Sequence, residues 1–227
     1  MPTTTPNRNY PYPLGADPIN VALDIERLAK AVDLDVNTLL VNRFANKAAL
    51  DAWTTAPAGT LATTTALPMT TWIKTATIWL PHSGALPAIY MQKADGAGIA
   101  SGQWVTLGWT GPLQRRLITW PTATEIRADY PGIYDVFLTV RFSSNGAGQR
   151  LSVIGNPGGY NYYEGTHPGT GPHATNFTIG GPVTLNAGDV VQAKVYQDSG
   201  AGLTLGGATA TGLNTTLSVE WRGPKDS

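Results

Sequence analysis

The sequence predicts a mainly β protein whose second half is an antiparallel sandwich. Short runs with apolar residues mostly two apart recur there, of which "IYDVFLTVRF", residues 133–142, is the clearest. Asn-Gly, Pro-Gly and Gly-Gly pairs separate these runs and are typical of tight turns. Helical and strand patterns do not alternate, which argues against a parallel α/β sheet.

Composition excludes several classes of function. Fifteen Lys and Arg balance fifteen Asp and Glu, so no net field attracts nucleic acid or an anionic membrane. The chain has no cysteine, which excludes disulfides, thiolate metal sites and cysteine nucleophiles. We find neither a signal-peptide pattern nor an apolar run of membrane-spanning length. We therefore expect a soluble protein, made in a cytoplasm without a cleaved signal.

Residues 1–16 are rich in proline and tyrosine, which predicts an extended arm without internal hydrogen bonds. Such an arm can lie on the surface of another protein, and a flexible tail is the alternative. The residues predicted to anchor it are Tyr10, Pro11, Tyr12 and Pro13.

Residues 17–43 are predicted to hold an amphipathic helix and a linker. Asp17 and Pro18 suit the N-cap and the first helical position. Glu26 and Lys30 are one turn apart and can form an ion pair. The helix is too short to be stable alone, so it packs against copies of itself or against its own domain. Its predicted apolar seam is Val21, Ile25, Leu28 and Val32.

Residues 44–112 are predicted to form a small β module. It begins with "NKAALDAW", a short helix at best, in which Asn46 is a suitable cap. Its tryptophans favour core packing over a sugar-binding platform, because a small module needs large apolar side chains. The predicted core residues are Trp72, Trp79, Trp104 and Trp109.

Residues 113–227 carry the motifs of a known fold. Gly132-Ile133-Tyr134 opens a central strand, Leu185 with Gly188-Asp189 leads into another, and residues 217–221 form a last strand. This order resembles the trimeric jelly roll of the complement globular-head and tumour-necrosis-factor superfamily. The resemblance implies a jelly-roll head domain and a homotrimer. Asp189 after Gly188 favours a structural role in a turn over a catalytic one.

The first 110 residues carry a second resemblance. The segments "YPLGADPINVALDIERLAKAVD", "RFANKAALDAW" and "QWVTLG" are similar to the opening of minor tail proteins and tail fibres of phages that infect actinobacteria. This implies a bacteriophage virion protein located in the phage tail. Its N-terminal arm would bind another tail protein, and its trimeric head would act as a receptor-binding protein in host adsorption. The alternatives are a purely structural fibre or capsid decoration protein, and a tailspike-like enzyme that degrades glycans.

The predicted receptor site lies in "GNPGGYNYYEGTHPGTGPHATN", residues 155–176, which we interpret as one long loop. Long loops on a rigid sandwich often carry recognition, and tyrosine faces suit the sugar rings of a host cell-wall glycan. Alternatively, the tyrosines pack on the sandwich or line a subunit contact. The candidate residues are Tyr160, Tyr162, Tyr163, His167 and His173.

Catalytic and metal-binding patterns are weak. The carboxylates are scattered rather than paired, and no serine lies in a Gly-x-Ser-x-Gly elbow. His82, His167 and His173 form no i, i+4 pair on a predicted helix, as a helical metal site requires. We therefore expect no enzymatic activity, no cofactor and no metal.

Overall fold

The computed structural model describes residues 3–4, 11–12, 25–30, 42–67, 69–93, 97–206 and 214–225. The chain forms two compact units, Met1–Gly84 and Ala85–Ser227, which are described separately. Within the described ranges, no helix has the length and apolar character needed to cross a membrane.

The N-terminal part of the first unit contains a short strand pair and a helix. The arm was predicted to lack internal hydrogen bonds, but within it β1 (Thr3–Thr4) and β2 (Pro11–Tyr12) pair antiparallel, which corrects that prediction. Residues 25–30 are helical, as predicted, and Lys30 contacts Glu26 at 2.5 Å. The seam residues Ile25 and Leu28 are 61% and 42% exposed. Val21 and Val32 of the seam, and Tyr10 and Pro13 of the arm, lie outside the described residues.

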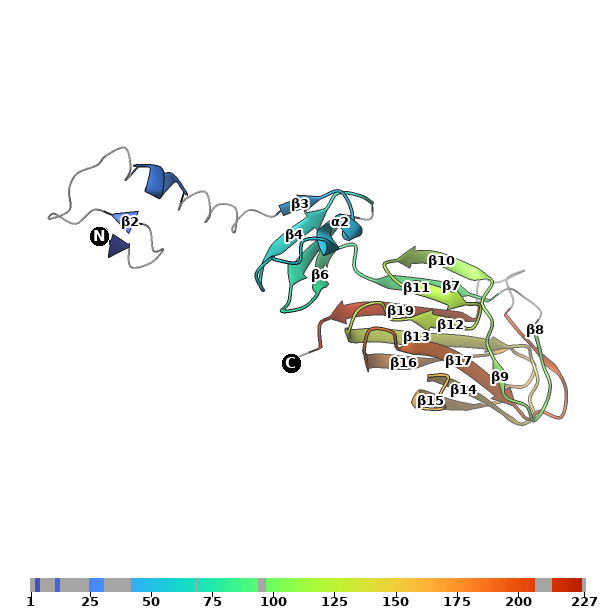
Figure 1. The fold of residues 1–227 in the computed structure, drawn as a ribbon. Coiled ribbons are helices and arrows are strands. Elements are labelled where there is room, and N and C mark those ends of the chain that lie inside the picture. Colours follow the sequence, from blue (N-terminus) through green and yellow to red (C-terminus); the bar gives the residue numbers. More distant parts are fainter. Residues whose placement is uncertain are drawn as a thin grey trace. The chain divides into compact units, whose positions relative to one another are not determined.

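The rest of the first unit is a four-stranded sheet with one short helix (Figure 1). The sheet order is β3 (Asn42–Phe44), β4 (Leu61–Thr64), β5 (Thr70–Lys74) and β6 (Trp79–Gly84), with only the β3–β4 pair parallel. The predicted short helix is confirmed as α2 (Lys47–Asp51), and the Asn46 side chain accepts a hydrogen bond from the Ala49 backbone N–H at 2.9 Å. Trp72 and Trp79 are buried in this unit as predicted.

The second unit is a sandwich of two antiparallel sheets (Figure 1). The first sheet has the order β10 (Gly111–Arg116), β7 (Ala88–Gln92), β19 (Thr216–Gly223), β13 (Gly132–Phe142), with β16 (Thr175–Leu185) on the other side of β13. The short strands β18 (Leu203–Leu205) and β8 (Ala97–Ile99) extend this sheet. The second sheet has the order β11 (Thr119–Thr122), β12 (Glu125–Arg127), β17 (Val190–Gln197), β14 (Gln149–Gly155), β15 (Asn161–Pro168), and β9 (Val105–Thr106) also pairs with β17.

The strand pairs are nested, which defines a jelly roll. β14 pairs with β15, β13 with β16, β12 with β17, and β7 with β19, so each later pair in this series encloses the one before it in sequence. Alternation along β13 explains the core, because every second side chain from Tyr134 to Phe142 is fully buried. The predicted jelly-roll fold is confirmed.

The motif residues of the predicted jelly roll have structural roles. A Cβ at Gly132 would lie 2.2 Å from Trp221 Nε1, so the close approach of β13 and β19 leaves no room for a side chain. Tyr134 is fully buried and its hydroxyl donates to the Tyr130 carbonyl at 2.7 Å. Leu185 ends β16 inside the core.

The Gly-Asp turn is also structural. Gly188 has a φ of +94°, which favours glycine. The Asp189 carboxylate accepts a hydrogen bond from the Asn186 backbone N–H at 2.7 Å and therefore closes the turn before β17. The structural role predicted for Asp189 is confirmed.

The boundary predicted between residues 112 and 113 is wrong. The sandwich unit begins at Ala85, because β7 and β10 complete its first sheet and Met91 of β7 packs in its core. Trp109 is therefore buried in the sandwich, not in the first unit. Trp104 is in neither core, since it is 49% exposed and contacts Tyr196. Short β runs of similar composition on both sides of Gly84 hid this boundary.

Candidate binding site

The segment predicted as a long loop is largely an edge strand. Residues 161–168 form β15, which pairs along its length with β14, so Tyr162, Tyr163 and His167 lie on a strand. The glycines that suggested a loop allow close packing instead. A Cβ at Gly165 would lie 2.3 Å from Ile179 Cγ2, so glycine lets β15 approach β16. The loop prediction is corrected to a short turn, a strand and a second loop near His173.

The turn before β15 presents Tyr160 to solvent. The Asn156 side chain accepts a hydrogen bond from the Tyr160 backbone N–H at 3.0 Å, and the Asn156 N–H donates to the Tyr160 carbonyl at 2.9 Å. The Tyr160 side chain is 66% exposed. Its ring meets the Tyr162 ring edge to face at 5.5 Å. The turn therefore fixes an exposed aromatic ring rather than leaving it free.

The three tyrosines line one open pocket with a volume of about 290 Å³. The opposite wall comes from β16 and consists of Pro182, Val183 and Thr184. The Tyr163 hydroxyl donates to the Pro182 carbonyl at 2.8 Å, which joins the edges of the two sheets. This volume is at the lower end of the range for ligand pockets, which is about 300–1,000 Å³. The pocket suits one small ring-shaped group.

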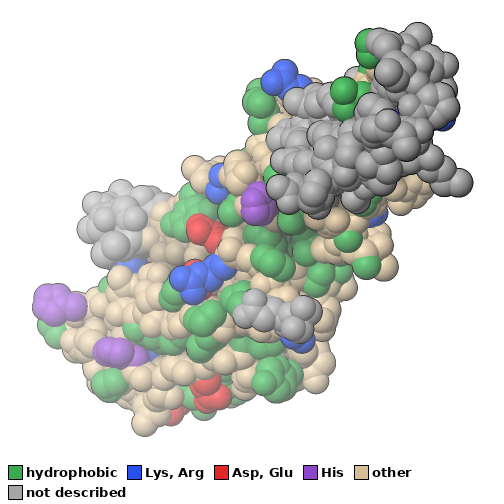
Figure 2. All heavy atoms as spheres, turned by 90° about the vertical axis from the view of Figure 1, so that its left-hand side faces the viewer, with side chains coloured by type: hydrophobic (Ala, Val, Ile, Leu, Met, Phe, Trp, Pro, Cys, Tyr) green, Lys and Arg blue, Asp and Glu red, His purple; other side chains and the backbone are tan. Residues whose placement is uncertain are grey.

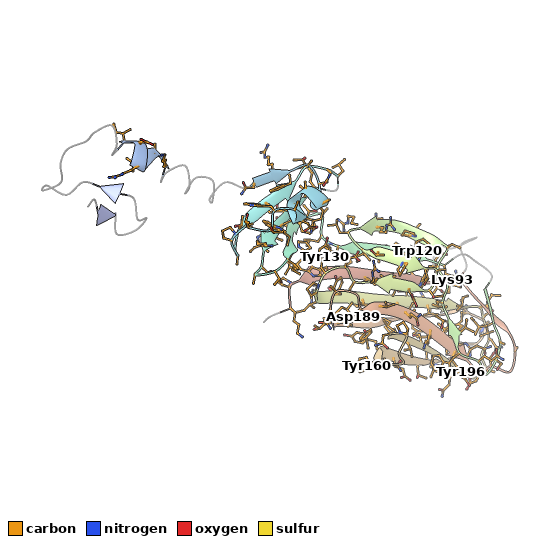
Figure 3. The ribbon with its side chains drawn as sticks, viewed as in Figure 1. Lys93, Trp120, Tyr130, Tyr160, Asp189 and Tyr196 are labelled. Atoms are coloured by element: carbon orange, nitrogen blue, oxygen red, sulfur yellow. The ribbon has the colours of Figure 1, made fainter. Side chains whose placement is uncertain are left out.

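The surroundings of Tyr162 raise the pKa of its hydroxyl. Burial raises the pKa of Tyr162, and the negative charge of Asp189 raises it further, while a hydrogen bond with the Asn156 side chain opposes the shift. Figure 3 shows Tyr160 and Asp189 near the same end of the sandwich. A phenol is protonated at neutral pH even without this shift, so the Tyr162 hydroxyl can donate a hydrogen bond there.

The two histidines lie away from the tyrosine pocket. The His167 ring stacks on Phe177 with 5.5 Å between centroids, and its Nδ1 lies 2.9 Å from the Pro168 carbonyl oxygen. His173 is exposed in the loop after β15, where its carbonyl accepts the Thr170 hydroxyl. Sequence reasoning thus grouped five residues, of which the structure brings three together. In the part of the chain that the structure describes, no three His, Asp or Glu residues are placed to hold a metal ion.

Sequence reasoning missed the wall formed by Pro182, Val183 and Thr184. The available signal was "IGGPVTL", because two glycines and a proline inside a strand pattern indicate a close backbone approach at a sheet edge. A Cβ at Gly181 would lie 2.7 Å from the Tyr163 hydroxyl oxygen, so glycine makes the space for this tyrosine.

A separate apolar surface lies on the outer face of the first sheet. Phe137 of β13 and Tyr90 of β7 are 42% and 38% exposed and lie in one cross-strand row through Ser218 of β19. The neighbouring row contains threonines, and the Thr139 and Thr178 hydroxyls lie 2.8 Å apart. Charges begin in the row on the other side of Phe137, where Arg222 pairs with Asp135 at 2.9 Å. We call Tyr90, Phe137, Thr139, Thr178, Thr216 and Ser218 the outer β13 face.

Several carboxylates of the sandwich have structural partners. Asp189 closes a turn, Asp135 pairs with Arg222, and the Asp129 carboxylate accepts the Thr119 hydroxyl at 2.8 Å. The Asp198 carboxylate accepts the Gln149 backbone N–H. Figure 2 shows few acidic and basic side chains on the described surface that faces the viewer, and both signs are present.

Fold and site together define an antiparallel jelly-roll domain with an aromatic pocket at one edge. Two crystal structures of murine APRIL, at pH 8.5 and pH 8.0, are similar to this chain at 14% and 15% identity, with TM-scores of 0.44 and 0.43. Each comparison covers 60% of this chain and 98% of APRIL, a jelly-roll protein of the tumour-necrosis-factor family. Because both TM-scores lie below 0.5, the fold assignment rests on the strand order of the chain itself. No family model matches the sequence. The search of curated proteins gives no significant match.

Proposed function

We propose that this chain is a bacteriophage virion protein whose jelly-roll head binds a glycan on the host surface. The observation that carries the proposal is the pocket between β15 and β16, in which three tyrosines face Pro182, Val183 and Thr184. The resemblance of the first 110 residues to minor tail proteins supports attachment to the phage tail through the N-terminal arm.

The pocket chemistry suits a sugar ring. Aromatic rings stack on the C–H faces of pyranoses, and hydroxyl groups bind sugar hydroxyls by hydrogen bonds. Tyr160 supplies the most exposed ring, and Tyr162 supplies a protonated hydroxyl. The Tyr163 hydroxyl is engaged with Pro182, so this residue shapes the wall of the pocket. The ligand of this site would be one sugar unit of a cell-wall polymer.

We further propose that the head is a homotrimer. The outer β13 face exposes Phe137 and Tyr90 on a sheet surface without charges in its two central rows. Exposed apolar surface of this kind marks an interaction site. The helical residues Ile25 and Leu28 are also exposed, as a seam shared by several copies requires. Light scattering is expected to give three times the chain mass of 24.0 kDa, and a strictly monomeric protein would contradict this assembly.

The binding proposal is tested with the full chain and purified host cell-wall polysaccharide. Tyr160→Ala removes an exposed ring without opening the core, so it is expected to weaken binding about tenfold while leaving the melting temperature unchanged. Leu113→Ala is the matched control, because Leu113 is 59% exposed on β10, which is separated from β16 in the first sheet by β7, β19 and β13. Equal binding by both variants and the unchanged protein would refute the site.

A purely structural fibre or decoration protein is the second candidate. This candidate is favoured by the hydrogen bond from Tyr163 to Pro182, because a tyrosine that joins two sheet edges has a structural role even without a ligand. Incubation of the protein with host polysaccharide distinguishes the two candidates. Absence of binding favours the structural protein, and binding without cleavage favours the receptor-binding protein. Release of oligosaccharides would instead indicate the tailspike-like enzyme.

A further inference from the structure

A second aromatic surface lies on the outer face of the other sheet. Trp104 directly precedes β9, and its ring lies 5.4 Å from the ring of Tyr196 on β17. The pairing of Val105 with Val195 and of Thr106 with Lys194 places Trp104 opposite Tyr196. Trp104 is 49% exposed, although tryptophan is usually well buried in folded domains. The β9–β17 pairing thus holds a tryptophan at the surface.

Two parallel rows of side chains extend from this pair across the sheet. The first row runs from Trp104 and Tyr196 to Leu151 of β14 and Thr166 of β15. The second row contains Thr106, Lys194, Val153 and Glu164. Neighbouring strands are about 4.8 Å apart and successive rows on one face about 7 Å apart. Trp104 and Leu151 therefore bound an aromatic and apolar strip about 10 Å long, with a polar row beside it.

The polar row carries one charge of each sign. Lys194 is half-buried and Glu164 is exposed, and Val153 lies between them in the register. Within the described part of the chain, neither forms an ion pair. An ammonium group donates hydrogen bonds and a carboxylate accepts them, so the row offers both functions to sugar hydroxyls. Because the two charges cancel, an anionic or cationic polymer gains no net attraction.

We propose that this strip binds a neutral polysaccharide, with two consecutive pyranose rings on Trp104 and Tyr196 and their hydroxyls on Lys194 and Glu164. A length of about 10 Å accommodates two rings of a glycan chain. The strip is separate from the tyrosine pocket, because Thr166 lies near the far end of β15 from Tyr160. Figure 3 shows Tyr160 and Tyr196 toward opposite ends of β14 and β15. The inference uses no residue of the tyrosine pocket and goes beyond the function proposed for it.

The consequence of two sites on one head is avidity. A single polymer chain that occupies both sites is held far more tightly than by either site alone, provided that its length spans them. We therefore expect long polysaccharides to bind more tightly than disaccharides of the same sugar, and this difference to depend on Trp104.

The test uses the full chain, three neutral probes (dextran, mannan and galactan) and the anionic probe polygalacturonate. Retardation in affinity gels is expected with at least one neutral probe and not with polygalacturonate. Trp104→Ala is expected to weaken that binding about tenfold, and Trp104→Phe about threefold or less, because phenylalanine keeps a flat ring. Circular dichroism and the melting temperature confirm that both variants fold.

Tyr160→Ala separates this inference from the proposed receptor site. The strip is supported when Trp104→Ala weakens binding and Tyr160→Ala leaves a neutral probe bound. The strip is refuted if no neutral probe binds, if polygalacturonate binds more tightly, or if Trp104→Ala binds like the unchanged protein. It is also refuted if Trp104→Ala lowers the oligomer mass, since the strip would then be a contact between copies.

Discussion

Replacing Gly132 by alanine tests whether the close approach of β13 and β19 at the start of β13 determines the stability of the head. The added Cβ would lie 2.2 Å from Trp221 Nε1 and 2.4 Å from the Gly223 carbonyl oxygen. The indole can rotate only by leaving the core, where Trp221 is 4% exposed, and the carbonyl belongs to the β13–β19 ladder. Overpacking of this kind costs about 1–3 kcal/mol, and a backbone contact places the change at the upper end.

The measurement is thermal unfolding of Gly132→Ala at one protein concentration, because the proposed homotrimer would make the melting temperature depend on concentration. A loss of about 3 kcal/mol corresponds to a decrease of about 6–12 °C in a unit of this size. Gly223→Ala is the matched control, since Gly223 pairs with Ile133 beside the same site but has nothing within 4 Å of an added Cβ. Equal melting of Gly132→Ala and the unchanged protein, or an equal loss in Gly223→Ala, would refute the reasoning.

Three other changes have defined outcomes. Phe137→Glu places a charge in the apolar row of the outer β13 face and is expected to give a monomer in light scattering, whereas Leu113→Glu is not. Arg150→Met is expected to lower the unfolding free energy by about 2 kcal/mol in urea titration, because the guanidinium donates to the carbonyls of Asn145, Ala147 and Gln149. Burial raises the pKa of Tyr134 in the folded protein above its value in the unfolded chain, which is about 10. Above pH 10 the unfolded chain loses this proton first, so the contribution of Tyr134 to stability is complete below pH 10 and is lost at higher pH. Tyr134→Phe should therefore reduce the loss of stability above pH 10.

The second half of the fold could be predicted from sequence because the spacing of apolar residues along its strands indicates which face of each strand is buried. The buried Val136, Leu138 and Val140 lie two residues apart along β13, and the Gly188-Asp189 pair is typical of a turn. Alternation of this kind reflects one buried and one solvated face, which is a local property of a strand. The jelly-roll order was implied by the resemblance of these motifs to the complement globular-head and tumour-necrosis-factor superfamily.

The domain boundary and the shape of the site depend on pairing between distant residues. β7 is a short β run like the strands before Gly84, and its ladders with β19 and β10 assign it to the sandwich. Similarly, Gly165 is typical of a loop in the sequence, and only its contact with Ile179 in the structure explains why a strand has glycine there. Propensity has no information on such contacts, so β15 was predicted as a loop and the wall at Pro182 was missed.

The position of β19 means that the first sheet of the head can be completed only after this strand has been synthesised. This strand follows every other described strand, yet it lies between β13 and β7 in the middle of a sheet. Until it emerges, the nascent chain leaves β7 and β10 without the neighbour that joins them to β13. Any chain that terminates before residue 216 would therefore expose two unpaired ladders and be directed to proteolysis or aggregation. Only copies that contain β19 would complete this sheet.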